Sequence, residues 1–123
     1  MSSTDKIIQW NCRGLKVNFI EITQLVKALN PIAPCLQETH LKTSDKDKIS
    51  LKNYSLYSTY SDDSERAAGG SSIFINNNII HSPVALNTEL QAVAVRVSLS
   101  ETVTSVPFIS LRVRLYQIHS YTI

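Results

Sequence analysis

Residues Lys6–Leu41 read KIIQWNCRGLKVNFIEITQLVKALNPIAPCLQETHL, and this stretch predicts a strand, a helix and a second strand joined by turns. The apolar run Ile7–Trp10 is typical of a buried strand. A polar, glycine-containing turn over Asn11–Leu15 ends it. The run Ile32–Leu36 predicts a second buried strand. Two buried strands joined by a helix pack as a right-handed crossover, so the two strands should be parallel.

The helix between these strands has clear start and stop signals. Asn18 is a good N-cap residue, and Glu21 stands three positions later, as in a capping box. Asn30-Pro31 ends the helix, because proline lacks an N–H and disfavours helix at the preceding residue. The apolar residues of its buried face recur at helical spacing: Ile22, Leu25, Val26 and Leu29.

Asn11 and Glu38 should lie at the carboxyl ends of the two parallel strands, and therefore at the same edge of the sheet. An amide and a carboxylate at such an edge indicate the beginning of a metal or phosphate site. The alternative is that Asn11 forms a turn and Glu38 is a solvated strand end. On spacing alone this alternative is favoured, because turns use such residues routinely.

Two motifs shift that balance: WNCRGL at Trp10–Leu15 and LQETHL at Leu36–Leu41. Together they resemble the endonuclease/exonuclease/phosphatase superfamily, and within it the endonuclease domain of non-LTR retrotransposons of the jockey and RTE type. The resemblance implies an α/β fold, a four-layer αββα sandwich. It also implies that Asn11 is a catalytic residue in the cleft near the scissile phosphate. Glu38 would be a catalytic ligand of Mg²⁺ or Mn²⁺. Magnesium takes oxygen ligands and keeps several waters, so one carboxylate and a substrate phosphate can hold it.

Two later segments extend the resemblance. RAAGGSSIFI, at Arg66–Ile75, looks like the family's glycine pair before a central strand. Asn76–Asn78 predicts a turn, after which Ile79-Ile80 would complete a hairpin. LQAVAVRVSL, at Leu90–Leu99, predicts a core strand with alternating valines.

The family pattern stops near Val106. A strand with a catalytic Tyr, a Gly-Asp-x-Asn motif and a Ser-Asp-His motif should follow, and the chain has none of them. We therefore expect a partial domain over residues 6–106, holding about the first half of the family's fold. Residues 107–123 would be a divergent tail from a frameshift or truncation, since Asp, Glu, Lys and Gly vanish after Glu101. Ile109–Leu115 still alternates apolar and polar residues, which predicts a strand with a basic face.

The resemblance implies a fragment of a metal-dependent DNA endonuclease that is catalytically incomplete. Its partner would be DNA, and intact relatives would carry a reverse transcriptase domain downstream, which is absent here. One alternative is an active phosphodiesterase that uses His40, His81 or His119 as base. Another is a non-catalytic module that binds a partner or self-associates through an uncovered sheet.

Composition fits a single globular domain, with 123 residues, 43% hydrophobic and 18% charged. The net charge of +2 does not by itself indicate a nucleic-acid surface. No apolar run is long enough to span a membrane and the first residues are polar, so we expect an intracellular chain, nuclear or cytoplasmic. Cys12 and Cys35 should then be reduced. The charged run Lys42–Leu51 is expected to be a solvated loop, and His81 a surface residue.

Overall fold

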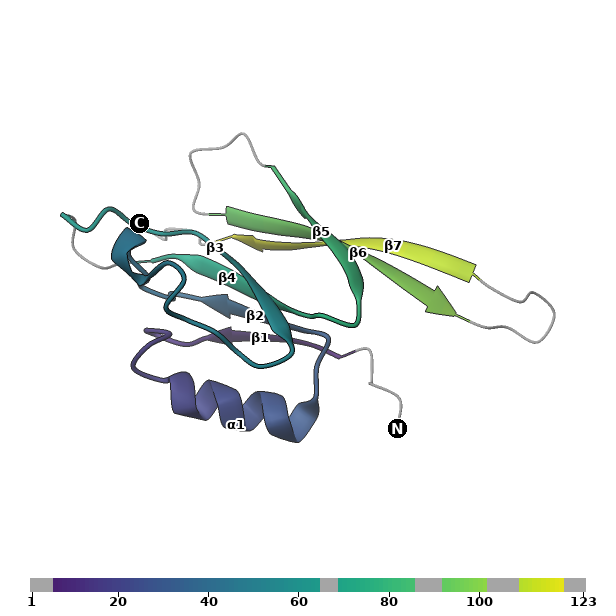
Figure 1. Cartoon of the computed structure of the whole chain (residues 1–123), viewed down its shortest axis with the longest axis horizontal. Coiled ribbons are helices and arrows are strands. Elements are labelled where there is room, and N and C mark those ends of the chain that lie inside the picture. Colours follow the sequence, from purple (N-terminus) through teal and green to yellow (C-terminus); the bar gives the residue numbers. More distant parts are fainter. Residues whose placement is uncertain (1–5, 65–68, 86–91, 102–108, 119–123) are drawn as a thin grey trace.

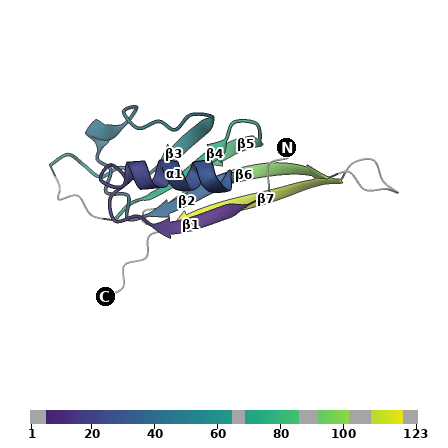
Figure 2. The ribbon, with the colours of Figure 1, turned by 90° about the horizontal axis from the view of Figure 1, so that it is seen from below.

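One helix and two β-sheets lie in successive layers in the computed structural model (Figures 1 and 2). The structure describes residues 6–64, 69–85, 92–101 and 109–118, with side chains in the first two ranges and in 92–98. Its elements are β1 Ile7–Asn11, α1 Phe19–Leu29, β2 Ala33–Gln37, η1 Thr43–Asp45, β3 Tyr54–Ser58, β4 Ser71–Asn76, β5 Ile80–Val84, β6 Ala92–Glu101 and β7 Ile109–Ile118.

The first sheet has the strand order β1-β2-β4-β3, and the second has the order β5-β6-β7. β1 and β2 are parallel, as the sequence predicts, and the other pairings between described strands are antiparallel. The prediction that the first strand is buried is wrong, because β1 is an edge strand whose residues alternate between exposed and half-buried. The predicted hairpin after β4 is wrong. The Asn76–Asn78 turn forms, with Ile79 N–H donating to Asn76 O at 3.0 Å. However, β4 already has β2 and β3 at its two edges, so the chain crosses to the second sheet to form β5.

Two apolar cores hold the layers together, because alternate residues of a strand point to opposite faces. Leu36 packs under α1, whereas its neighbour Cys35 packs between the sheets. We call these clusters the helix-side core and the inter-sheet core. The helix-side core contains Cys12, Leu15, Ile22, Val26, Leu36, Leu41, Leu51 and Phe74. The inter-sheet core contains Ile32, Ala33, Cys35, Ile73, Ile75, Val95 and Val97.

β6 presents its predicted face to the inter-sheet core through Val93, Val95 and Val97. Its whole length pairs with β7, from Ala92 opposite Ile118 to Glu101 opposite Ile109. The strand expected from the alternation after Val106 is thus confirmed, whereas the domain boundary there stays a prediction.

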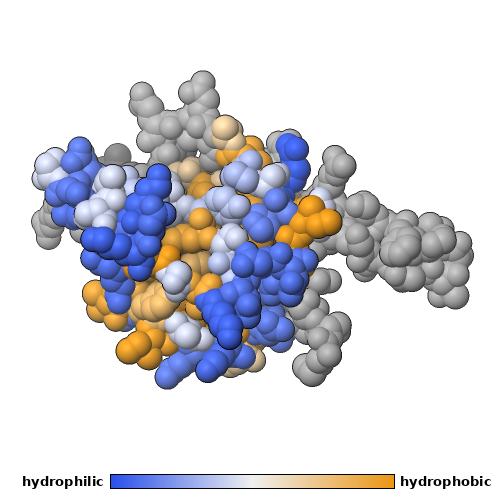
Figure 3. Space-filling view, viewed as in Figure 1, coloured by the Kyte–Doolittle hydropathy of each residue, from blue (hydrophilic) through white to orange (hydrophobic). Residues whose placement is uncertain are grey.

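The expected fold class is confirmed: α1 covers one sheet, and the second sheet packs on the opposite face of the first. Within the described ranges, no helix covers the outer face of the second sheet. No helix in those ranges is long and apolar enough to cross a membrane. On the face drawn in Figure 3, apolar surface is exposed near α1, where Val17 and Ile20 are 85% and 75% exposed.

Two local expectations are corrected. Asn18 occupies the N-cap position, but its side chain makes no cap hydrogen bond. Its amide instead donates to Cys12 O at 2.6 Å and ties α1 to the turn after β1. Asp45 is buried rather than solvated, and it pairs with Lys16 instead of its lysine neighbours in sequence.

Candidate active site at the ends of β1 and β2

Asn11 and Glu38 lie at the same edge of the first sheet. Asn11 is the last residue of β1 and stands opposite Gln37, the last residue of β2, which Glu38 follows. The hydrogen-bond ladder continues past both strands, because Cys12 N–H donates to Gln37 O at 3.0 Å and Gly14 N–H to Glu38 O at 2.8 Å. The Asn11 side chain is exposed and that of Glu38 is half-buried, so both can meet a ligand from solvent.

The backbone at this edge adopts left-handed conformations. Arg13, Glu38 and His40 have φ values of 50°, 52° and 56°, which non-glycine residues rarely adopt. Such conformations persist only where surrounding structure holds them, and they cluster at functional sites. The turn after β1 and the turn after β2 hold each other here, since Leu15 N–H also donates to Thr39 O at 2.9 Å.

The glycine pair before β4 closes over the turn after β2. His40 N–H donates to Gly69 O at 2.9 Å, and Thr39 N–H approaches Gly70 O at 3.4 Å. Gly70 has φ 97°, and a Cβ on it would lie 2.7 Å from Thr39 Oγ1. A side chain at position 70 would displace the Thr39 hydroxyl and would be strained by the positive φ. No local sequence signal indicates this packing role of Gly70.

Thr39 is 1% exposed, and its hydroxyl has no hydrogen-bond partner among the described residues. A buried hydroxyl without a partner costs free energy. The close approach of Gly70 therefore buries an unsatisfied oxygen directly after Glu38.

Cys12 lies under the same edge, where burial raises the pKa of its thiol and the nearby Glu38 carboxylate raises it further. Burial raises the pKa of Cys35 to about 11. Both cysteines are free, as expected for reduced thiols. Within the described residues, no group of three or more His, Cys, Asp or Glu could hold a metal ion. A cation at Glu38 would therefore complete its shell with the Asn11 amide oxygen, waters or ligand oxygens.

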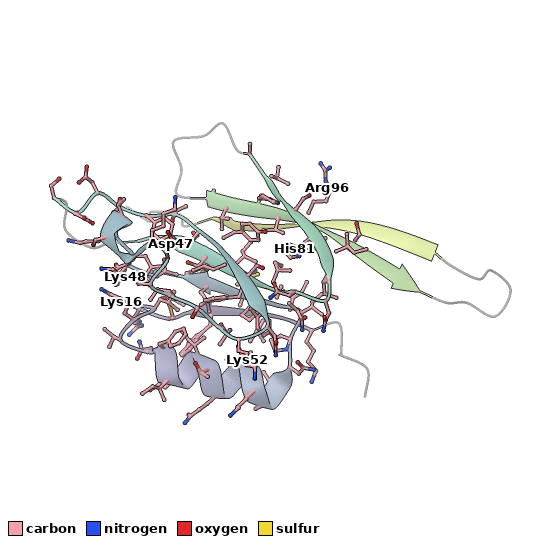
Figure 4. The ribbon with its side chains drawn as sticks, in the orientation of Figure 1. Lys16, Asp47, Lys48, Lys52, His81 and Arg96 are labelled. Atoms are coloured by element: carbon pink, nitrogen blue, oxygen red, sulfur yellow. The ribbon has the colours of Figure 1, made fainter. Side chains whose placement is uncertain are left out.

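A basic pocket of about 260 Å³ adjoins this edge. Lys16 Nζ lies 2.8 Å from Asp45 Oδ1, and Asp45 Oδ2 accepts the Lys42 N–H at 2.9 Å. These bonds hold the pKa of Asp45 below its usual value, with the Lys16 contact the largest cause. Figure 4 shows Lys16 at the end of the sheet where β1 and β2 finish. The pocket is lined by Arg13, Gly14, Lys16, Val17, Thr39, His40, Lys42 and Asp45.

The structure places two of the three candidate histidines. His40 lines the basic pocket next to Glu38. His81 lies in β5 and is half-buried rather than a surface residue, with Nδ1 2.7 Å from Ile79 O and Nε2 3.1 Å from the Tyr57 hydroxyl. Both nitrogens of its ring are therefore engaged. His119, like Arg66, lies outside the described residues.

No family model matches the sequence, and no curated protein matches it. Solved structures do resemble it in fold. The catalytic domain of APE2 from Xenopus laevis matches with a TM-score of 0.61 at 15% identity, over 94% of this chain and 44% of that one. The AP endonuclease LMAP from Leishmania major matches with a TM-score of 0.55 at 22% identity, over 86% and 38%. The 3′-5′ exonuclease NExo from Neisseria meningitidis matches with a TM-score of 0.53 at 16% identity, over 88% of this chain and 39% of that one. The chain thus has the fold of AP endonucleases and exonucleases, and it spans less than half the length of these structures.

Proposed function

We propose that the chain is the amino-terminal part of a metal-dependent DNA endonuclease of the endonuclease/exonuclease/phosphatase superfamily, of the non-LTR retrotransposon type. The observation that carries the proposal is the juxtaposition of Asn11 and Glu38 at the ends of paired parallel strands. The WNCRGL and LQETHL motifs meet at this edge. The shared fold with AP endonucleases and an exonuclease supports the nuclease class.

The donor set at this edge suits a hard divalent cation. Glu38 offers a half-buried carboxylate on a hydrogen-bonded turn, and Asn11 offers an exposed amide. Carboxylate and amide oxygens are ligands that Mg²⁺ and Mn²⁺ accept, with substrate phosphate and water completing the shell. A bound cation would neutralise charge on the phosphodiester. Glu38 would hold it, and Asn11 would orient the scissile phosphate.

The motifs that supply the family's general base are missing from the sequence. Neither Gly-Asp-x-Asn nor Ser-Asp-His occurs in the chain, and loss of a general base alone costs about 10²–10⁴-fold in rate. We expect the isolated chain to bind Mn²⁺ weakly through Glu38 and to show negligible nicking of plasmid DNA. Robust Mg²⁺-dependent nicking that disappears in Glu38→Ala would contradict this incompleteness.

Metal binding tests the proposed site directly. Mn²⁺ titration followed by electron paramagnetic resonance should show binding to the wild-type chain and at least about a tenfold weaker binding to Glu38→Gln, since one carboxylate is the main protein ligand. Glu21→Gln makes the same change on the exposed first turn of α1 and should leave the affinity unchanged. Equal Mn²⁺ affinities of Glu38→Gln and Glu21→Gln would show that Glu38 is not a metal ligand.

The same proposal treats residues 107–123 as an out-of-frame tail. Phe108 is encoded by TTT or TTC, and the codon of Ile109 begins with AT. In the frame that begins at the third base of each codon, the last base of the Phe108 codon and the first two of the Ile109 codon form TAT or CAT, which encode Tyr or His. The triplet before it joins the last base of the Pro107 codon to TT, and it therefore encodes Phe, Leu, Ile or Val. Such a frame fits the strand with a Tyr that the family pattern expects here.

Sequencing of the coding DNA beyond the Val106 codon tests whether residues 107–123 are read out of frame. We expect the shifted frame to contain Gly-Asp-x-Asn and then Ser-Asp-His. A chain extended in that frame should nick plasmid DNA with Mg²⁺, and Glu38→Ala should abolish this activity. Absence of Gly-Asp-x-Asn from all three frames would reject the frameshift.

A histidine-based enzyme remains the second catalytic candidate, and His40 is its best base because its ring lines the pocket beside Glu38. His81 is disfavoured, since both its nitrogens are engaged. Nicking by the isolated chain that depends on His40 would favour this candidate.

Self-association is the non-catalytic candidate, and one observation favours it. β7 pairs with β6 along one edge and, within the described ranges, with no strand along the other. An open strand edge is a template for pairing with another chain. Sedimentation that reveals a concentration-dependent dimer, without nicking or metal binding, would favour this candidate over the nuclease fragment.

A further inference from the structure

The basic pocket beside Glu38 is a separate ligand site. We propose that Arg13 and Lys42 bind one phosphate group of a nucleic-acid backbone there, next to the scissile phosphate that Asn11 and a cation on Glu38 would hold. The choice of nucleic acid as the source of this phosphate rests on the proposed function.

The charges in the pocket are unbalanced. The lining holds three cations and a single carboxylate, that of Asp45. Lys16 engages one Asp45 oxygen, and the Lys42 backbone N–H engages the other. Among the described residues, the one hydrogen-bond acceptor of the Lys42 ammonium is the Asp63 carbonyl oxygen, at 3.4 Å. Arg13 and the Lys42 side chain therefore have no carboxylate partner among the described residues, and their charge is available to an anion.

The backbone that carries Arg13 and Lys42 is held in place before any ligand binds. The left-handed backbone at Arg13 is set by the Gly14 N–H, which donates to Glu38 O at 2.8 Å. Lys42 is fixed by its bond to Asp45 and by a bridge to Ser61. Binding of a phosphate therefore has to order the two side chains but not the backbone that carries them.

A phosphodiester fits this chemistry better than a carboxylate ligand of unknown origin. The guanidinium fork of Arg13 matches two phosphate oxygens, and the Lys42 ammonium adds a point charge. The pocket opens beside the turn that carries Glu38. A nucleic-acid strand with one phosphate at Glu38 can therefore present a neighbouring phosphate to Arg13 and Lys42.

The test measures binding of a fluorescently labelled DNA duplex by anisotropy, with EDTA present so that no metal at Glu38 contributes. The variants are Arg13→Gln and Lys42→Gln. Lys27→Gln and Lys52→Gln make a matched loss of charge along the groove beside α1. Figure 4 shows Lys52 beside α1, away from Lys16.

Each pocket variant should weaken binding about fivefold at low salt and reduce the slope of log affinity against log salt by about one. The control variants should change affinity less than about twofold. Equal losses in both pairs would mean only general attraction to positive charge and would overturn the site, as would unchanged binding by Arg13→Gln and Lys42→Gln.

Inorganic phosphate distinguishes the source of the ligand. Phosphate should compete with the duplex for the wild-type chain more strongly than chloride of equal ionic strength, and this difference should vanish in Arg13→Gln. Phosphate binding that depends on Arg13, without any effect of the variants on the duplex, would overturn the nucleic-acid assignment. The duplex measurements in EDTA contain no metal and the Mn²⁺ titration contains no nucleic acid, so failure of the metal site and failure of this pocket give different results.

Discussion

Gly70 and Thr39 form the tightest contact that holds the turn carrying Glu38. The glycine sits at φ 97°, with the space for its Cβ taken by the Thr39 hydroxyl. A glycine at this point lets β4 begin against the turn after β2. The packing of Gly70 against Thr39, the residue after Glu38, thus depends on the lack of a side chain at position 70.

Gly70→Ala should lower the free energy of unfolding by about 1–3 kcal/mol, because it combines a positive φ with a 2.7 Å clash. Urea unfolding followed by circular dichroism measures the loss. In a Thr39→Ala background the clash is removed and only the backbone strain remains, so the same substitution should cost less. An equal cost in both backgrounds would show that the hydroxyl contact is unimportant.

Asp45 should give the chain a pH-dependent stability. Its pKa is lowered in the fold by Lys16 and by the Lys42 N–H, so its contribution is present above its unfolded pKa near 4 and is lost as pH falls through the folded value. Asp45→Asn should cost about 1 kcal/mol at pH 7, since Lys16 is 56% exposed and the pair is partly screened. Urea unfolding should show the difference from wild type shrinking below pH 4. A constant difference would exclude the ionised carboxylate as its cause.

Among the elements, α1 is anchored by the side chain of Asn18 in an unusual way. The amide donates to Cys12 O at 2.6 Å instead of accepting a helix N–H. The helix start is thereby tied to the residue that follows Asn11.

Asn18→Asp should therefore lower the free energy of unfolding by about 1 kcal/mol, because a carboxylate cannot donate to Cys12 O. At an ordinary N-cap the same change is nearly neutral. Thermal unfolding at pH 7 should place Asn18→Asp close to Asn18→Ala. A variant as stable as wild type would mean that Asn18 acts as an ordinary cap.

The β1–α1–β2 unit was predictable because its signals are local. Apolar runs, the helical spacing from Ile22 to Leu29 and the Asn30-Pro31 stop each act within a few residues. The core-facing side of β6 followed in the same way from alternation. The edge that joins Asn11 to Glu38 then followed from the handedness of the crossover.

What escaped prediction depends on contacts between distant residues. Nothing local shows that β4 has both edges occupied, that Lys16 reaches Asp45, or that Gly70 packs on Thr39. These contacts are set by sheet order, which one sequence does not reveal. The roles of Asn11 and Glu38 rest on family motifs and stay predictions until metal binding is measured.

At the scale of the whole molecule, β7 completes the second sheet, although it lies beyond the point where the family pattern stops. Strand pairing needs only alternation and length, and Ile109–Ile118 supplies both. Residues 109–118 thus pair with the whole of the long strand β6, whether or not this segment has diverged from the family pattern.

Removal of residues 109–123 should abolish cooperative thermal unfolding, because ten paired positions of β6 lose their partner. Removal of residues 119–123 alone, which follow the last paired residue, should leave the transition within about 2 °C of wild type, because every described strand pair is kept. Differential scanning calorimetry compares the three chains. An unchanged transition without β7 would show that the hairpin with β6 adds nothing to the fold.

The two buried cysteines can report the rates of local unfolding in the two layers of the chain. Cys12 belongs to the helix-side core and Cys35 to the inter-sheet core, and burial keeps both thiols protonated and shielded. An alkylating reagent can therefore reach each thiol only after its own layer separates. The two modification rates, resolved by mass spectrometry, report how often the helix lifts from the sheet and how often the sheets part.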